Sequence, residues 1–253
     1  RKAFDHHNRF DSNPDVLPKP LLWRDVFGLR RRVHLCSFGR ASSRRFPGTG
    51  KDIPMKQIVA SGSFDNIMSQ DVRFLEEAAK FGPLHVFLWS DETVNVMTWA
   101  EPKFPMKERR YILEAVRYVH KVVQLDAVSS DEELLRVEEF EPRMWVVDKD
   151  SHTPQKYALC ASKGIRYSVI DDADLTRFPC VPYDPGPTSP NQKVVVTGCF
   201  GWFHSGHVRF FEETSELGDL YVIVGHDDNV RLLKGDHHPL IHEHDRCYMA
   251  GSI

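Results

Sequence analysis

Two histidines stand three residues apart where a short apolar strand gives way to a helix. They are His204 and His207, with Ser205 and Gly206 between them, and the apolar run Val194–Val196 precedes them. A helix N-terminus attracts phosphate, because free backbone N–H groups and the positive end of the helix dipole point outward there. Residues three apart on a helix share a face, so both imidazoles can add hydrogen-bond donors. The spacing therefore predicts a binding site for a phosphorylated ligand.

The surrounding sequence narrows the class of protein. Residues 196–208 read V-T-G-C-F-G-W-F-H-S-G-H-V, and the chain continues R-F-F-E-E-T-S-E-L-G-D-L-Y-V-I-V-G. In this setting the H-x-G-H motif resembles the cytidylyltransferase-like nucleotidyltransferase superfamily. The resemblance implies an enzyme that transfers a nucleotide from a nucleoside triphosphate to a small phosphorylated alcohol or sugar and releases pyrophosphate. The segments F-H-S-G-H-V-R-F and N-V-R-L-L-K-G are most similar to the cytidylyl branch, and an adenylyltransferase is the alternative.

The resemblance also assigns roles to residues. In this family catalysis consists of positioning the reactants and neutralising the charge that builds on the α-phosphate. The implied catalytic residues are His204, His207 and Lys234. The implied nucleotide-binding residues are Thr197, Gly198, Cys199, Phe200, Gly206 and Arg246. Mg²⁺ is the expected cofactor, bridging phosphate oxygens, and no residue is predicted to hold a resident metal.

Two departures from the family pattern leave a different class of function open. Relatives carry Asp in the turn G-x-F-D, whereas this chain has Gly201 there. The family segment R-x-x-G-I-S-[ST]-[ST], which contacts the nucleotide, is absent from the sequence. A catalytically impaired nucleotide-binding or scaffold protein is therefore the second hypothesis.

The sequence contains an internal repeat. A constant offset that places Gly198 on Gly62 also places Phe200 on Phe64 and Arg246 on Arg110. Two copies of one α/β fold are predicted, as tandem Rossmann-like parallel-sheet domains of which the second is truncated. The expected organisation is a basic, poorly ordered extension at 1–54, a degenerate first copy at 55–180, a Pro-rich linker at 181–192 and the N-terminal part of an H-x-G-H domain at 193–253. A chain that starts at Arg1 and stops at Ile253 is expected to be a fragment.

Strand–helix alternation in the first copy predicts a parallel sheet covered on both faces. The expected strands are Gln57–Ser61, Leu84–Trp89, Val122–Leu125, Met144–Val147 and Arg166–Ile170. The expected helices are Val72–Phe81, Lys107–Tyr118, Asp131–Glu139 and Pro154–Lys163. In the second copy, Val208–Leu217 is the expected helix after the two histidines.

The first copy has lost the phosphate chemistry. Met68-Ser69-Gln70-Asp71 replaces the H-x-G-H motif, and Asp71 is expected to repel phosphate, although Asp65 keeps the family aspartate. We expect this copy to support the fold, a dimer contact or acceptor binding. Two further groups of residues invite a metal interpretation, although solvated loops explain them as well. These are Asp148, Asp150, Asp171, Asp172 and Asp174, and the histidines 237, 238, 242 and 244.

Composition limits the partners. The net charge of −3 gives no general case for a nucleic-acid partner, and no apolar run has the roughly 18–20 residues of a membrane span. Five scattered cysteines without C-x-x-C spacing favour reduced thiols and a cytoplasmic protein, although the Arg- and Ser-rich residues 24–51 leave organelle targeting open. The expected partners are a nucleoside triphosphate and a small phosphorylated acceptor. A homodimer is also a candidate, because relatives are commonly dimers.

Overall fold

A five-stranded parallel sheet forms the centre of the first copy in the computed structural model, which describes residues 34–37, 57–125, 142–179 and 190–253. Its strands are β2 (Gln57–Gly62), β3 (Leu84–Trp89), β4 (Val119–Leu125), β5 (Pro142–Asp148) and β6 (Arg166–Ile170). They lie in the order β4-β3-β2-β5-β6, with every neighbouring pair parallel. This is the doubly wound order in which the chain crosses from one half of the sheet to the other beside its first strand. The fold is therefore α/β and Rossmann-like.

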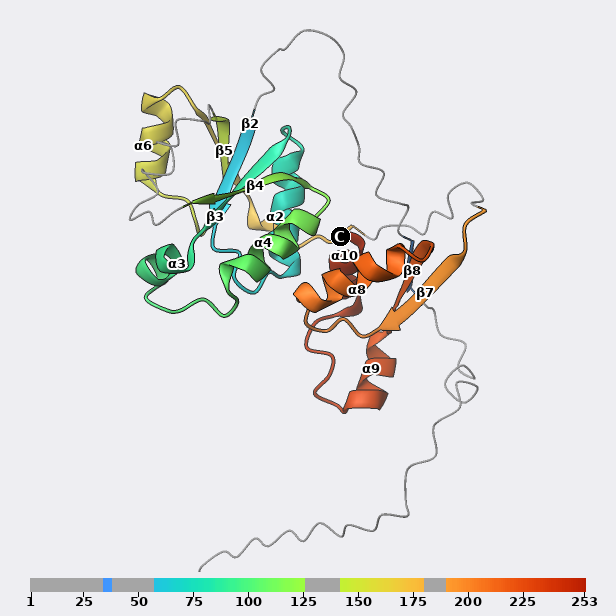
Figure 1. The fold of residues 1–253 in the computed structure, drawn as a ribbon. Helices are drawn as coiled ribbons and strands as arrows, with labels where there is room; N and C mark the ends of the chain where they lie inside the picture. The colour runs from blue at the N-terminus through green and yellow to red at the C-terminus, as the bar shows by residue number, and fades with distance from the viewer. Residues whose placement is uncertain (1–33, 38–56, 126–141, 180–189) are drawn as a thin grey trace, which may run out of the picture. The chain divides into compact units, whose positions relative to one another are not determined.

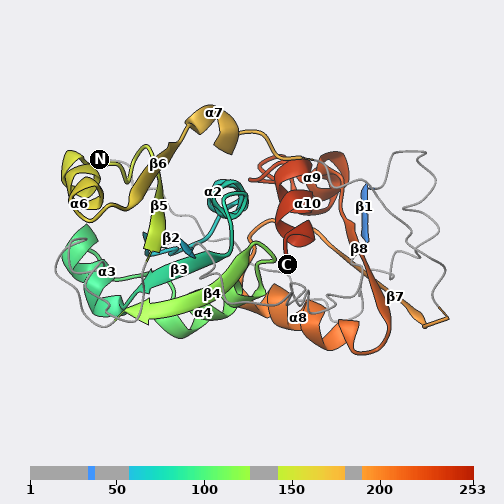
Figure 2. The ribbon, with the colours of Figure 1, turned by 90° about the horizontal axis from the view of Figure 1, so that it is seen from above.

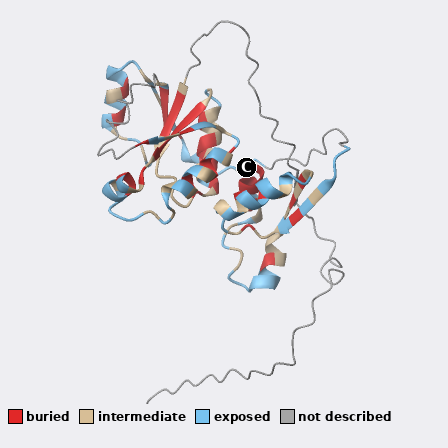
Figure 3. Ribbon diagram, in the orientation of Figure 1, coloured by how far each residue is buried: buried red, intermediate tan, exposed pale blue. Residues whose placement is uncertain are grey.

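Helices cover both faces of this sheet (Figure 1, Figure 2). They are α2 (Ser69–Ala79), α3 (Asp91–Thr98), α4 (Met106–Ala115), α6 (Pro154–Ser162) and α7 (Asp172–Leu175). Helices α2 and α4 contribute Leu75 and Leu113 to one core, which includes Val86 from the sheet. Helix α6 places Cys160 against the opposite face, beside Trp145. Burial on both faces makes β2, β3 and β5 the most buried strands (Figure 3), as expected for a covered parallel sheet.

The second copy is built on a smaller sheet of three strands in the order β1-β8-β7. Strands β7 (Lys193–Gly198) and β8 (Asp219–Val224) are parallel, and β1 (His34–Ser37) pairs antiparallel with β8. Its helices are α8 (Ser205–Ser215), α9 (Asp227–Lys234) and α10 (Glu243–Gly251). Strand β1 pairs with the outer edge of β8. In the first copy, β4 pairs with the equivalent edge of β3. The poorly ordered extension expected at 1–54 stays a prediction, and within it the structure describes the strand His34–Ser37.

The two copies share strand register, which supports the predicted repeat. Ile58 pairs with Leu84 in the first copy, and Val194 pairs with Leu220 in the second. The constant offset that places Gly198 on Gly62 also places Val194 on Ile58 and Leu220 on Leu84. Residues 33–253, which include both copies, form one compact unit. The two copies are therefore described together.

Element boundaries differ from the predictions where local hydrogen bonds decide. Helix α2 begins at Ser69 and not at Val72, because the Asp71 carboxylate accepts the Met68 N–H at 2.7 Å and starts the helix earlier. Helix α4 ends at Ala115, because Val116 is already extended and leads into β4. Helices α3 and α7 were not predicted, and the helix expected at 131–139 lies outside the described residues. Among the described helices, none has the length and apolar character needed to cross a membrane.

Candidate active site

The turn after β7 has a strained backbone at Phe200. This residue has a φ of 49°, in the left-handed region that costs a non-glycine residue about 1 kcal/mol or more. Its buried ring lies over Gly198, where a Cβ would be only 2.8 Å from the ring. Phe64 repeats this turn in the first copy, with a φ of 45° over Gly62. Gly198 is therefore needed for the packing of Phe200, and its predicted contact with a nucleotide stays a prediction, as does that of the exposed Thr197.

His204 caps helix α8 with its own ring. Its Nδ1 accepts the Gly206 N–H at 3.1 Å, so Nδ1 is unprotonated and Nε2 carries the proton of the neutral ring. A Cβ on Gly206 would lie 2.9 Å from the His204 ring, so glycine is what permits this cap. The His207 N–H donates to the His204 carbonyl at 2.9 Å. The first turn of α8 thus uses the N–H groups of Gly206 and His207 internally, and an exposed imidazole N–H becomes the donor at this helix end.

His207 lies against His204, with ring centroids 4.1 Å apart. Its ring also stacks on Phe203 at 5.4 Å and meets the edge of Phe200 at 5.3 Å. Burial among these rings, with a smaller contribution from His204, lowers the pKa of His207 to about 4, so the ring is neutral at pH 7. Its Nδ1 is buried and has no hydrogen-bond partner among the described residues. A hydrogen bond from this ring to a ligand is therefore expected from Nε2.

Arg246 is buried and binds the protein itself. Its guanidinium donates to the carbonyls of Ile241 at 2.9 Å and Gly225 at 2.7 Å, and to the carbonyl of Cys199. It also donates to the Asp227 carboxylate at 2.6 Å, and it holds the pKa of that carboxyl below its usual value against the opposing effect of burial. These bonds join the turn after β7, the end of β8 and the loop before α10. Arg246 thus shapes the carboxyl ends of the strands, and a direct contact with nucleotide stays a prediction.

The first copy contains the same clamp around Arg109. This residue donates to the carbonyls of Phe104 and Trp89, both at 3.0 Å, to the carbonyl of Ser63, and to Asp91 at 2.7 Å. The structural equivalent of Arg246 is therefore Arg109 and not Arg110. The alignment at a constant offset was wrong here, because the loop before α10 has one more residue than the loop before α4. Arg110 is exposed and pairs with Glu114.

Gly201 has no side chain at the position where the first copy has Asp65, whose carboxylate holds a loop in place. The Asp65 carboxylate accepts the N–H groups of Lys103 at 2.8 Å and Phe104 at 2.9 Å, which ties the loop before α4 to the turn after β2. A Cβ on Gly201 would meet nothing within 4 Å. The family aspartate therefore organises a loop in the first copy, and the second copy lacks that hydrogen-bonding side chain.

Asp71 closes the corresponding site of the first copy. It stands at the position of His207, and its half-buried carboxylate accepts the Met68 N–H. Burial raises the pKa of Asp71 despite that hydrogen bond. A carboxyl group of the protein itself thus lies at the N-terminus of α2, where a phosphate would otherwise bind. The loss of phosphate chemistry in this copy stays a prediction, and the position of Asp71 supports it.

Lys234 is the last residue of α9 and is exposed. Its predicted contact with phosphates stays a prediction. The metal interpretations gain no support, because no three His, Cys, Asp or Glu side chains converge in the part of the chain that the structure describes. Lys149 bridges Asp171 at 3.1 Å and Asp172 at 3.2 Å, while His242 faces Asp227 at 3.2 Å.

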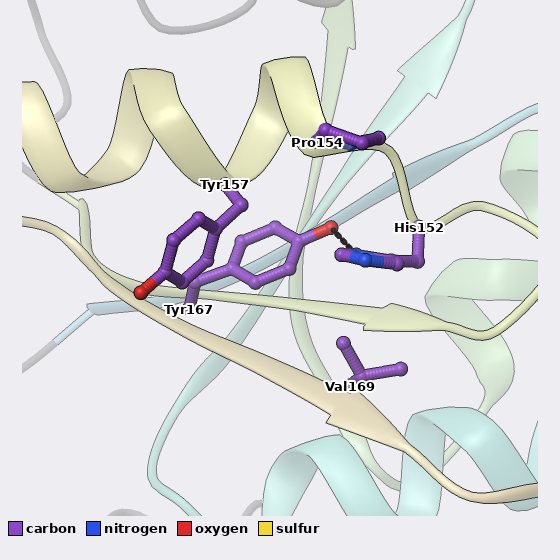
Figure 4. Close-up of a pocket in the computed structure, with 5 residues that line it drawn as sticks. All are labelled: His152, Pro154, Tyr157, Tyr167 and Val169. Carbon is purple, nitrogen blue, oxygen red and sulfur yellow. Dashed lines mark hydrogen bonds between the residues drawn. The ribbon is translucent and has the colours of Figure 1, made fainter.

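A separate hollow of about 460 Å³ lies in the first copy (Figure 4). It is lined by His152, Pro154, Tyr157, Tyr167 and Val169, and the His152 Nδ1 lies 3.0 Å from the Tyr167 hydroxyl. None of these residues belongs to the predicted site. Its walls are mostly apolar, and the His152 ring and the Tyr167 hydroxyl already face each other. The hollow therefore gives no specific indication of a reaction.

Asp227 is the residue that sequence reasoning missed. It opens α9, and its two carboxylate oxygens face Arg246 and His242. The repeat contained the signal, since the constant offset places Asp227 on Asp91, which binds Arg109 in the same way. The first copy has lost the histidines but keeps this aspartate–arginine pair. The pair therefore belongs to the fold that both copies share.

A Rossmann-like sheet, a glycine turn and an H-x-G-H helix start define an α/β protein of the nucleotidyltransferase type. The chain belongs to the cytidylyltransferase-like family, whose sequence profile matches residues 59–170 and 195–253.

Individual relatives match a short stretch only. The bifunctional protein HldE of Hydrogenovibrio crunogenus (strain DSM 25203 / XCL-2) is 51% identical over 67 residues, which is 26% of this chain and 14% of that protein. The HldE of Helicobacter pylori (strain P12) is 37% identical over 68 residues, 26% of this chain and 15% of that protein. A lipopolysaccharide core biosynthesis protein from Thermoplasma volcanium GSS1 has a TM-score of 0.40 at 20% identity, over 46% of this chain and 95% of that chain. A structural likeness of this size carries no argument about function.

Proposed function

We propose that the second copy binds a nucleoside triphosphate at the N-terminus of α8 and transfers its nucleotidyl group to a small phosphorylated alcohol or sugar. The observation that carries this proposal is the pair of adjacent imidazoles, 4.1 Å apart between centroids, at the start of α8. An acceptor oxygen would attack the α-phosphorus, and the bond from that phosphorus to the leaving pyrophosphate would break. Negative charge builds on the phosphate oxygens during this step, which hydrogen-bond donors at fixed positions stabilise.

The chain's own residues would act as donors and positioning groups. His204 offers its Nε2–H, because the cap fixes its tautomer. His207 is neutral at pH 7, so no buried positive charge has to be stabilised before the ligand arrives. Lys234 supplies a positive charge on a long, exposed side chain. These roles follow the family motif and the geometry of α8.

Mg²⁺ would enter this site as an ion carried by the triphosphate, as the resemblance to the family implies. The metal would supply charge neutralisation to the phosphate oxygens when bound. CTP is the nucleotide we favour, because the residues around His207 and Lys234 are most similar to the cytidylyl branch.

An adenylyltransferase of the same superfamily is the nearest alternative. A nucleotide-binding or scaffold protein without turnover is the alternative from another class, and Gly201 is the observation that favours it. Both alternatives keep the ligand at α8 and differ from the main proposal in base or in chemistry.

Pyrophosphate release with Mg²⁺ tests the proposal, using CTP and ATP separately against a pool of phosphorylated alcohols and sugars. We expect release from CTP, and we expect His207→Ala to lower kcat by about 10²–10³-fold, the usual effect of removing one donor to a developing oxyanion. His152→Ala in the first copy is the matched control and should keep the activity. Release from ATP alone would indicate the adenylyl alternative. Calorimetric binding of CTP without release would indicate the scaffold, and no binding of either nucleotide would refute all three.

A further inference from the structure

The two copies contact each other through pairs of hydrogen bonds that the repeat relates. The Ser69 hydroxyl donates to Asp245 at 3.0 Å, and the Ser205 hydroxyl donates to Glu108 at 3.0 Å. Ser69 and Ser205 are equivalent by the constant offset that relates the glycines. Glu108 and Asp245 are equivalent by an offset one residue longer, the same one that relates Arg109 to Arg246. The first contact is therefore repeated with the roles of the copies exchanged.

A second pair of contacts obeys the same exchange. The Tyr248 hydroxyl donates to Glu76 at 2.7 Å, and the Tyr111 hydroxyl donates to Glu212. Glu76 and Glu212 are equivalent by the constant offset, and the two tyrosines by the longer one. Each copy thus offers an acidic residue, the clamp arginine and a tyrosine on one helix, spelled E-R-R-Y and D-R-C-Y.

This exchange is the signature of an isologous interface, in which one surface patch meets an equivalent patch through a two-fold axis. Helix α4 packs on α8, and the equivalent helix α10 packs on α2. Buried side chains from both copies belong to one hydrophobic cluster, which includes Leu113 and Phe211. The chain therefore contains within itself an arrangement that two separate chains would form as a dimer.

The two halves of this interface differ in one respect. Helix α2 begins with a site that Asp71 closes, whereas α8 begins with the two histidines. Ser205 is the residue between the cap His204 and Gly206, and Glu108 of the first copy accepts its hydroxyl hydrogen. A carboxylate near the start of a helix also interacts favourably with the helix dipole.

From these contacts we infer that the first copy is a built-in partner that positions α8 for the chemistry of the second copy. Glu108 and Tyr111 are positioning residues, since they hold the side chains of Ser205 and Glu212 on that helix. This inference rests on the proposed function of the histidines. It gives the degenerate copy a role in the reaction that its own lost motif does not suggest.

The mirror contact supplies the control. Glu108→Ala removes the contact at the start of α8, and Ser69→Ala removes the equivalent contact at the start of α2, where no histidine lies. We expect Glu108→Ala to lower kcat on the order of 10²-fold, the effect of a misplacement of about 1 Å, with KM for the nucleotide changed much less. Glu108→Gln keeps an acceptor oxygen and should restore most of the turnover. Ser69→Ala should leave kcat unchanged.

Hydrogen exchange of the α8 amides makes the inference testable apart from turnover. We expect faster exchange in the first turn of α8 for Glu108→Ala in the full chain, and no change there for Ser69→Ala. If the unchanged chain shows no pyrophosphate release, the proposed function fails, and the exchange data alone then decide whether Glu108 positions α8. Equal exchange and equal kcat in Glu108→Ala and the unchanged chain would overturn the inference. Equal losses of kcat in Glu108→Ala and Ser69→Ala would mean that both contacts contribute only to general stability. That result would also overturn the inference.

Discussion

Replacing Arg246 by lysine separates an architectural role from a direct contact with nucleotide. The Arg246 side chain is 0% exposed and donates to three carbonyls and the Asp227 carboxylate. Lysine keeps the positive charge, so the ion pair with Asp227 can persist. Arginine presents five donors in a fixed planar fork, whereas lysine has a single ammonium group. That ammonium group cannot reach all of the carbonyls that the guanidinium binds.

The expected cost follows from the carbonyls left without a donor. Lysine leaves about two of the three buried carbonyls unpaired, and each unsatisfied buried group costs about 1–3 kcal/mol. Arg246→Lys should therefore lower the free energy of unfolding by about 2–6 kcal/mol. For a unit of the size of residues 33–253, this corresponds to a fall in Tm of about 4–24 °C.

Urea unfolding followed by circular dichroism measures this loss, with calorimetric titration of CTP as the second assay. Arg110→Lys is the control, since Arg110 lies at the position that the sequence alignment gave to Arg246 but is 47% exposed and pairs with Glu114 on the surface. It should show no measurable change. The reasoning would be refuted if Arg246→Lys kept full stability and lost CTP affinity, because the guanidinium would then act on the ligand and not on the strand ends.

Two further predictions concern the turn and the histidine. Gly201→Asp should raise the free energy of unfolding by about 1 kcal/mol in urea titrations, because the site has room for the side chain and a carboxylate can accept loop amides as Asp65 does; an unchanged or lower stability would show that the longer loop before α10 does not approach it. His207 has a folded pKa of about 4 against an ordinary value of 6.5, so its neutral ring contributes stability that is complete above pH 6.5 and is lost as the pH falls toward 4. Tm measured between pH 7 and pH 4 should therefore fall less steeply for His207→Gln than for the unchanged chain, and parallel curves would contradict the burial of this ring.

Much of the fold could be predicted from the sequence, because the alternation of apolar runs and helical segments determines the sheet. Strands β3 and β6 begin and end at the predicted residues. Helix starts were harder to predict, since they depend on single side chains. Asp71 starts α2 three residues early, and the His204 ring starts α8 three residues before the predicted Val208. Short helices such as α7 have too few residues for a periodic pattern.

The site could be predicted in its residue types and less well in its geometry. The motif indicated His204 and His207, but the stacking that makes His207 neutral depends on Phe203 and Phe200 folding around it. The motif predicted that Gly198 and Gly206 bind the nucleotide, and this contact stays a prediction. In the structure the Phe200 ring lies on Gly198 and the His204 ring lies on Gly206.

The one-residue difference between the copies explains why the role of Arg246 was hidden. A constant offset aligns the strands and the glycines of the two copies, and it also aligns Asp91 with Asp227. The same offset, extended without a gap, places Arg246 on Arg110. The extra residue lies in the loop before α10, after the strands and before the arginine, where few side chains constrain an alignment. Only the identical sets of carbonyls around Arg109 and Arg246 reveal it. The longer offset then pairs Glu108 with Asp245 and Tyr111 with Tyr248. The contacts that join the copies and the clamp that shapes the strand ends therefore belong to one repeated helix.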